Sequence, residues 1–324
     1  MTDELDLLRR ANPVPVDGPC FGDGPLDHRA ERGLERLLGE GRPVRRAPRA
    51  RLLWGLAATG VVVATAATAV LGGPSTQPAL AAPRPLAVRA HSTPVPLAQL
   101  AELADAAAAE GAPRLRKGTH VQTWSLGMAE GQPPVTLPEE RVVRWRADDS
   151  HTELVVATDP RRPGRPVLTD TGGDPGLVAD GHVLSRTTYP PSWSDAPPDA
   201  PPPHTPAALR AYLAETVRSD SPSTPELLDG VGEVLDHWTL GARESAALVR
   251  VLADAKGLRP AGQVTDRLGR PGQAYVYQGG GGRRMLILDA RTGAVLGLET
   301  TFTRDDPAYG VKAGDVMEYS AWMR

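Results

Sequence analysis

The residues best suited to chemistry lie in a turn close to the C-terminal end of the chain. Asp266, Arg267 and Arg270 alternate there with Gly269 and Gly272. A carboxylate and two guanidinium groups on a tight turn can bind an anion or a sugar through charge-assisted hydrogen bonds. A structural interpretation is also open, in which Asp266 accepts backbone hydrogen bonds, the glycines supply the φ angles and the arginines lie in solvent. The first interpretation makes Asp266, Arg267 and Arg270 candidate ligand-binding residues.

A fourth candidate, Trp193, lies in the proline-rich stretch 189–206. That stretch has no helical or strand periodicity, and its prolines favour an extended, polyproline-like loop. The tryptophans at 124, 145, 238 and 322 fall on or beside predicted strands and helices, where they serve as core anchors. Trp193 is therefore the aromatic side chain best placed to contact a ligand or partner.

The sequence contains no motif for a disulfide, a metal site or a common hydrolase active site. The single cysteine, Cys20, excludes an intramolecular disulfide and a cysteine-based zinc or iron-sulfur site. The spacing of His120, His151 and His182 matches no metal-binding motif, and the usual serine-hydrolase and zinc-protease motifs do not occur. A net charge of -3 is unlike that of a basic nucleic-acid-binding protein. We therefore expect no enzymatic activity, no cofactor and no nucleic-acid partner.

The membrane is the first partner that the sequence indicates. Residues 52–71 (LLWGLAATGVVVATAATAVL) carry no charge, and a helix of this length covers the roughly 30 Å hydrocarbon core. Five arginines precede the span without an acidic residue among them: Arg42, Arg45, Arg46, Arg49 and Arg51. The positive-inside rule then places residues 1–51 in the cytoplasm and residues 72–324 outside. A cleaved signal peptide is the alternative, since Ala79-Leu80-Ala81 has suitable small residues, but the long leader favours an uncleaved signal-anchor.

The parts on either side of the span differ in size. Residues 1–51 hold two short helical stretches and too few apolar residues for a core of their own. Residues 72–95 form a Pro/Ala-rich tether, and residues 96–324 form an extracytoplasmic domain. Helical patterns cover 97–110, 206–217, 225–237 and 242–256. Strand patterns cover 120–126, 141–146, 151–158, 177–179, 182–187, 263–267, 273–278, 284–289, 294–303 and 316–322, with Asp180-Gly181 as a hairpin turn.

The order of these elements predicts the fold class. Pairs of strands alternate with groups of helices, so neighbouring strands are mostly antiparallel and the domain is α+β. A curved, mostly antiparallel sheet with helices packed on one face would bury the apolar side of both. Turn residues at 269–272 and 289–293 join the late strands.

Four segments together resemble a family of actinobacterial single-pass membrane proteins that is known by a locus-tag name and has no established activity. They are LLRRANPV (Leu7–Val14), the arginine cluster with its span, VTDRLGRPGQA (Val264–Ala274) and LILDARTGAVLG (Leu286–Gly297). The layout is more loosely similar to membrane-tethered anti-sigma regulators, whose outer domains can resemble the half-open sheet of lipoprotein carriers. The zinc-binding pattern of such regulators is absent, because Cys20 and His28 stand alone in residues 1–51.

The sequence thus predicts a non-enzymatic, single-pass cell-envelope protein whose outer domain binds or senses a ligand or a protein partner. The alternatives are an envelope lipid or lipoprotein carrier, a hydrolase with an unrecognised site, and an anti-sigma-like regulator. An open apolar groove on the concave face of the sheet would favour carriage or sensing, and a filled face would favour a scaffold.

Overall fold

The computed structural model describes residues 83–324 except 112, 171–174 and 197. The predicted span 52–71, its arginine cluster and segment 1–51 lie outside the described residues. No helix within 83–324, those gaps aside, has the length and apolar character needed to cross a bilayer.

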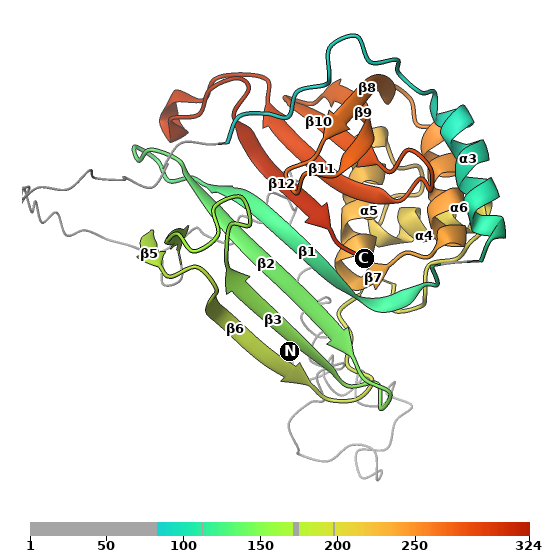
Figure 1. Cartoon of the computed structure of the whole chain (residues 1–324), viewed down its shortest axis with the longest axis horizontal. Coiled ribbons are helices and arrows are strands. Elements are labelled where there is room, and N and C mark those ends of the chain that lie inside the picture. The colour runs from blue at the N-terminus through green and yellow to red at the C-terminus, as the bar shows by residue number, and fades with distance from the viewer. Residues whose placement is uncertain (1–82, 112, 171–174, 197) are drawn as a thin grey trace, which may run out of the picture. The chain divides into compact units, whose positions relative to one another are not determined.

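The described residues form an α+β fold with four helices and a large antiparallel sheet, as predicted (Figure 1). The helices are α3 (Leu97–Ala109), α4 (Pro206–Thr216), α5 (Thr224–His237) and α6 (Ala242–Ala253). The strands are β1 (Arg116–Gly127), β2 (Val135–Trp145), β3 (His151–Ala157), β4 (Val167–Thr169), β5 (Gly176–Val178), β6 (His182–Tyr189), β7 (Trp238–Thr239), β8 (Arg259–Thr265), β9 (Pro271–Gly279), β10 (Gly282–Leu288), β11 (Val295–Phe302) and β12 (Val316–Trp322).

The large sheet has two halves that meet at β1 and β12. Its strand order is β6-β3-β2-β1-β12-β11-β10-β9-β8, and β7 pairs with β1. Each neighbouring pair is antiparallel, so the chain builds β1–β3 and β8–β12 largely from consecutive hairpins. The two halves join where Val121 of β1 lies opposite Trp322 of β12. The four helices gather beside β8–β12, whereas β2, β3 and β6 extend away from them (Figure 1). We call these three strands the wing.

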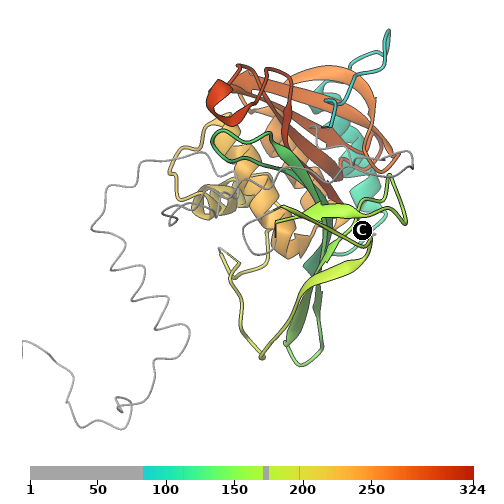
Figure 2. The same cartoon turned by 90° about the vertical axis from the view of Figure 1, so that its left-hand side faces the viewer.

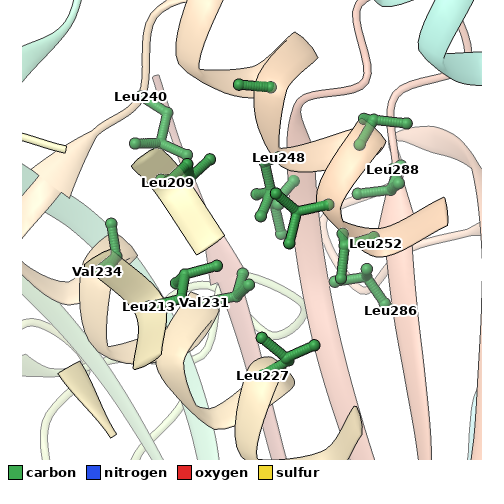
Figure 3. Close-up of a cluster of buried hydrophobic side chains, with 14 of the residues drawn as sticks. Leu209, Leu213, Leu227, Val231, Val234, Leu240, Leu248, Leu252, Leu286 and Leu288 are labelled. Carbon is green, nitrogen blue, oxygen red and sulfur yellow. The ribbon is translucent and has the colours of Figure 1, made fainter. Parts of the chain in front are cut away.

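The main core lies between the helices and β9–β12. Apolar side chains at helical spacing, such as Leu248 and Leu252 of α6, face the strand residues Leu286 and Leu288 (Figure 3). All four are at most 2% exposed. This burial removes most of their apolar surface from water, which is the main force that holds helices on a sheet.

A glycine lets the helices approach this sheet closely. Gly293 ends the predicted turn after β10 and has a φ of +66°. A Cβ atom there would lie 2.6 Å from Cγ2 of Val249 and 2.9 Å from Cβ of Ala104. Asp289 holds the turn by accepting from the backbone N–H groups of Arg291 and Thr292. The turn chemistry predicted for 289–293 is therefore confirmed, and it also sets how closely α3 and α6 pack on the sheet.

The opposite face of β8–β12 carries a second apolar cluster. It contains Trp124, Met285, Ile287 and Tyr319, all at most 1% exposed. Residues 84–92, which we call the strap, contact this face before α3 begins, and Leu86 and Val88 of the strap pack against the cluster. The sequence predicts these residues as part of the tether 72–95, whereas in the structure the strap packs on the folded domain.

The predicted hairpin around Asp180-Gly181 is wrong. The residues do form a turn, with Gly181 at a φ of +82°, but the strands that flank it join different partners. β5 pairs with β4, and β6 pairs with β3. Asp180 instead accepts hydrogen bonds from the Thr158 hydroxyl and the Gly164 N–H, both at 2.6 Å, and so fixes the loop that follows β3. Long-range pairing with β3 therefore outcompetes the local hairpin.

Candidate functional site

The structure assigns Asp266 and Arg270 to the stabilisation of their own turn. Oδ1 of Asp266 accepts from the N–H groups of Leu268 (2.9 Å) and Arg270 (2.7 Å), and Oδ2 accepts from Nε of Arg270 (2.6 Å). The guanidinium of Arg270 also donates to the carbonyls of Trp322 and Leu296, each at 2.6 Å. These contacts occupy the Asp266 carboxylate, whose side chain has no exposed surface. The turn interpretation of Asp266 is thus confirmed.

Arg267 is buried, although the turn interpretation placed it in solvent. Its side chain is 5% exposed and donates to Oε2 of Glu299 at 2.5 Å; the Glu299 side chain is fully buried. Its guanidinium also lies 5.2 Å from the ring centre of Tyr319. A charge is stable in such surroundings only when a close partner compensates it. Glu299, on β11, is that partner, and local sequence gives no sign of it because the two residues are far apart in the chain.

The strap completes this ion pair. The Leu86 N–H donates to Oε1 of Glu299 at 2.8 Å, and the Arg84 carbonyl accepts from Arg267 at 2.9 Å. Burial raises the pKa of Glu299, and the Arg267 guanidinium and the Leu86 N–H oppose that rise. The strap backbone and the ion pair engage Nη2 of Arg267 and both oxygens of Glu299, whereas Nε of Arg267 has no hydrogen-bond partner among the described residues. An external ligand would have to displace the strap to reach the ion pair. Asp266, Arg267 and Arg270 therefore hold the domain together in this structure.

Trp193 lies in a different place, within a column of stacked rings on the wing. Trp145, His151 and Tyr189 are direct neighbours on β2, β3 and β6, with ring centres 4.1 and 4.6 Å apart. Trp193 stacks on Tyr189 at 3.9 Å with an interplanar angle of 8°. At the other end, Nζ of Lys117 lies 3.5 Å from the centre of the Trp145 ring. Trp193 is half-buried, so one part of it contacts the column and another part remains accessible.

The column fixes the segment that follows β6. This segment runs from the tip of the wing up to the helices (Figure 2). Beyond Trp193, Asp195 lies 3.6 Å from Nδ1 of His237 at the end of α5, and the Ala200 carbonyl accepts from the Tyr212 hydroxyl at 2.8 Å. The proline-rich loop is therefore anchored at several points, and the stack is one of them.

His151 is the group of the column whose usual pKa lies closest to neutral pH. It is 4% exposed, and its Nδ1 has no hydrogen-bond partner among the described residues. Its removal from water between two rings lowers its pKa; Lys117 and Arg141 act in the same direction, whereas Asp195 and Glu153 oppose the change. The imidazole is thus neutral near pH 7.

Beside the column, the wing carries a connected set of polar groups that face α5. Arg141 of β2 forms an ion pair with Glu153 of β3 and donates to the Asp236 carbonyl at 2.9 Å. The Tyr189 hydroxyl donates to the other Glu153 oxygen at 3.3 Å. Burial by itself would raise the pKa of Glu153, but Arg141 and Tyr189 lower it overall. Glu153 is therefore ionised at neutral pH and binds the wing to α5 through Arg141.

The free side of the wing is accessible to solvent and positively charged. Of the β6 residues, Leu184 and Tyr189 are half-buried and the others are exposed. Three exposed arginines near this strand have no ion-pair partner in the part of the chain that the structure describes: Arg162, Arg165 and Arg186. Sequence reasoning missed them because arginine is abundant throughout the chain, and only the fold shows which arginines lack an acid.

The helical side of β9–β12 is filled by the main core. A cavity of about 20 Å³ beside α5 and α6 is lined by Thr119, Trp238, Ser245, Trp322 and others. It has room for about one water molecule. Within the described residues, no three His, Cys, Asp or Glu side chains are grouped so as to hold a metal ion. The exposed β6 strand and the arginines beside it therefore form the candidate site.

No protein-family model and no curated protein matches the chain. Among solved structures, it is similar to the dehydratase domain from the CurK module of Curacin polyketide synthase, at 11% identity over 72% of this chain and 82% of that chain, with a TM-score of 0.11. An inactive mutant of the CurK dehydratase matches with the same coverage and TM-score at 10% identity. At this TM-score neither match indicates a shared fold or function.

Proposed function

We propose that the chain is a single-pass cell-envelope protein, and that its extracytoplasmic domain is a non-enzymatic binding domain whose partner docks on the wing. The uncharged stretch 52–71 and the arginines before it support the topology. Residues 1–51 then anchor the protein in the cytoplasm or relay the bound state of the domain.

The observation that carries this proposal is the difference between the two edges of the sheet. At the β8 edge, the Arg89 N–H donates to the Gln263 carbonyl at 2.7 Å, and the Gln263 N–H donates to the Ser92 hydroxyl at 3.0 Å. The strap thus covers that edge. The β6 edge has no further strand beside it in the described part of the chain. Exposed edges promote unwanted pairing, so proteins usually cover or blunt them. Because the chain covers the edge at the opposite end of the same sheet, the open β6 edge favours a binding role.

The packed interior supports binding on the outside of the domain. A carrier of an acyl chain needs an apolar cavity of several hundred Å³. Here the helices α3–α6 fill the corresponding face of β9–β12, and Leu248, Leu252 and Leu286 lie where such a chain would have to enter. We therefore favour a partner-binding domain over a lipid carrier.

Two measurements test the proposal. A reporter that is active only outside the cytoplasm, fused after residue 324 or after residue 40, should be active in the first fusion alone; the reverse result would end the proposed topology. A photo-crosslinking amino acid at Thr187, on β6, should yield a discrete adduct in intact cells. The same group at Glu102, exposed on α3, should not. Equal adducts at both positions, or none at Thr187, would refute binding at the wing.

A further inference from the structure

The geometry points to a specific kind of partner: we infer that β6 binds an extended, acidic segment of another protein, which adds to the sheet as a further antiparallel or parallel strand. This inference rests on the proposed function and names the partner of the same surface.

The backbone of β6 is arranged for strand addition. Its residues 185–189 pair in regular register with residues 155–151 of β3, and a bulge interrupts the pairing between Val155 and Val156. In a regular antiparallel pair, every second residue directs its N–H and C=O away from its partner strand. The stretch 185–189 therefore presents unpaired backbone groups along its outer side. A segment that adds there gains main-chain hydrogen bonds without regard to its sequence.

The charges beside β6 select the sequence of the partner. Arg186 lies in the middle of the strand. The loop with Arg162 and Arg165 is held at the beginning of β6, because Gly164 donates to Asp180, two residues before His182. Exposed guanidinium groups along an edge favour a segment with carboxylates and disfavour one with lysines.

Three acidic residues near this edge in the described part of the chain are already engaged. Asp180 accepts from Thr158 and Gly164, Asp159 pairs with Arg161 at 2.9 Å, and Glu153 pairs with Arg141. Asp180 keeps its charge because both of its donors are neutral, but the three arginines outnumber it, so the net charge of these residues is positive. A second copy of the chain fits poorly, because pairing of two β6 strands would bring like charges together.

Apolar side chains at the start of the edge add a second preference. Val183 is 44% exposed and Leu177 is 53% exposed, and they are two of the four large apolar residues with such exposure in the described chain. A partner that alternates acidic and apolar residues would place its apolar side chains on one face of the added strand. This pattern matches both the charge and the apolar surface of the edge.

The test uses the full chain in neutral detergent and two labelled ten-residue probes, one alternating valine with glutamate and the other alternating valine with lysine. The glutamate probe should bind, with fluorescence anisotropy as the readout, and the lysine probe should not. Arg165→Glu together with Arg186→Glu should weaken binding about tenfold, as expected for exposed ion pairs that become repulsive. The matched control, Arg259→Glu with Arg304→Glu, reverses two exposed arginines elsewhere and should leave binding unchanged.

Strand addition is tested separately by N-methylation of alternate residues of the glutamate probe, in two registers. One register should lose binding, because its N–H groups face β6, and the other should keep it. Equal binding of both registers and displacement by phosphatidylglycerol micelles would assign the arginines to lipid and overturn the inference. Failure of the glutamate probe would also overturn it. An adduct at Thr187 would in that case still support binding at the wing, so the two proposals fail separately.

Discussion

Replacement of Arg267 by methionine should destabilise the domain and release the strap. Arg267 is 5% exposed and Glu299 is fully buried, so the variant leaves a carboxylate without its counter-charge in a site shielded from water. It also removes the hydrogen bond to the Arg84 carbonyl and the contact with the Tyr319 ring. Glu299 then keeps the Leu86 N–H as its hydrogen-bond donor among the described residues.

The magnitude follows from burial. Removal of one partner of a buried ion pair costs about 3–5 kcal/mol, against a total stability of about 5–15 kcal/mol for a typical protein. The loss should depend on pH. Burial raises the pKa of Glu299 above its usual 4.5, and Arg267 opposes this, so the variant has a still higher native pKa. The variant then loses stability as the pH rises from 4.5 through the native pKa of Glu299. Its loss of stability relative to the wild type shrinks below pH 4.5.

Two assays on the full chain measure the effect. Denaturant unfolding followed by tryptophan fluorescence gives the loss of stability, and hydrogen exchange gives the protection of the Leu86 and Arg89 amides, which should fall in the variant. Arg210→Met is the matched control, because Arg210 is 41% exposed and pairs with the exposed Asp254; it should cost less than about 1 kcal/mol. A similar loss of stability in both variants, with both strap amides still protected, would refute the role of the buried Arg267–Glu299 ion pair in holding the strap.

Three further changes test other parts of the structure. Gly293→Ala places a Cβ 2.6 Å from Cγ2 of Val249 and should lower the midpoint of thermal unfolding more than Gly314→Ala, since Gly314 also has a positive φ but has open space around it. The two variants should differ by about 1–3 kcal/mol in their free energy of unfolding. Because the native pKa of His151 is lowered, stability should fall as the pH drops below 6.5, and His151→Phe should flatten that profile. Asp159→Asn should cost about 1–3 kcal/mol, since it weakens charged hydrogen bonds at a buried carboxylate.

For each of these three predictions, one result would contradict the reasoning. Equal melting points for the two glycine variants would show that the turn after β10 is not in close contact with α6. An unchanged pH profile in His151→Phe would show that another group titrates in that range. Full stability of Asp159→Asn at pH 7 would show that the ion pair with Arg161 contributes nothing measurable.

Local patterns predicted most helices and strands because their causes lie within a few residues. The periodicity of 97–110 and 242–256 agrees with α3 and α6, and the turn residues at 289–293 form the turn expected of them. Even the small difference at α5 is local: the helix begins at Thr224 rather than at 225, directly after the cap Ser223, whose N–H donates to Glu226 at 2.8 Å.

The candidate site was predicted less well. The sequence identified Asp266, Arg267 and Arg270 as a chemically unusual group, but only the fold brings Glu299 and the strap to them. It also marked Trp193 as a contact residue, without any indication that Tyr189 would cover part of its ring. The strand patterns 141–146 and 151–158, which are separated by only four residues, are the sequence signal that places Trp145 near His151.

The sequence by itself therefore determined the α+β class, most of the elements and the chemistry of the turns, because periodicity and turn preference act between near neighbours. The tertiary structure decided which strands pair, which arginines lack an acid and which edge stays open. These depend on contacts between residues far apart in the chain, such as Arg267 with Glu299 and β3 with β6. A pairing of that kind is selected by the burial of the whole sheet face, which no short window of sequence contains.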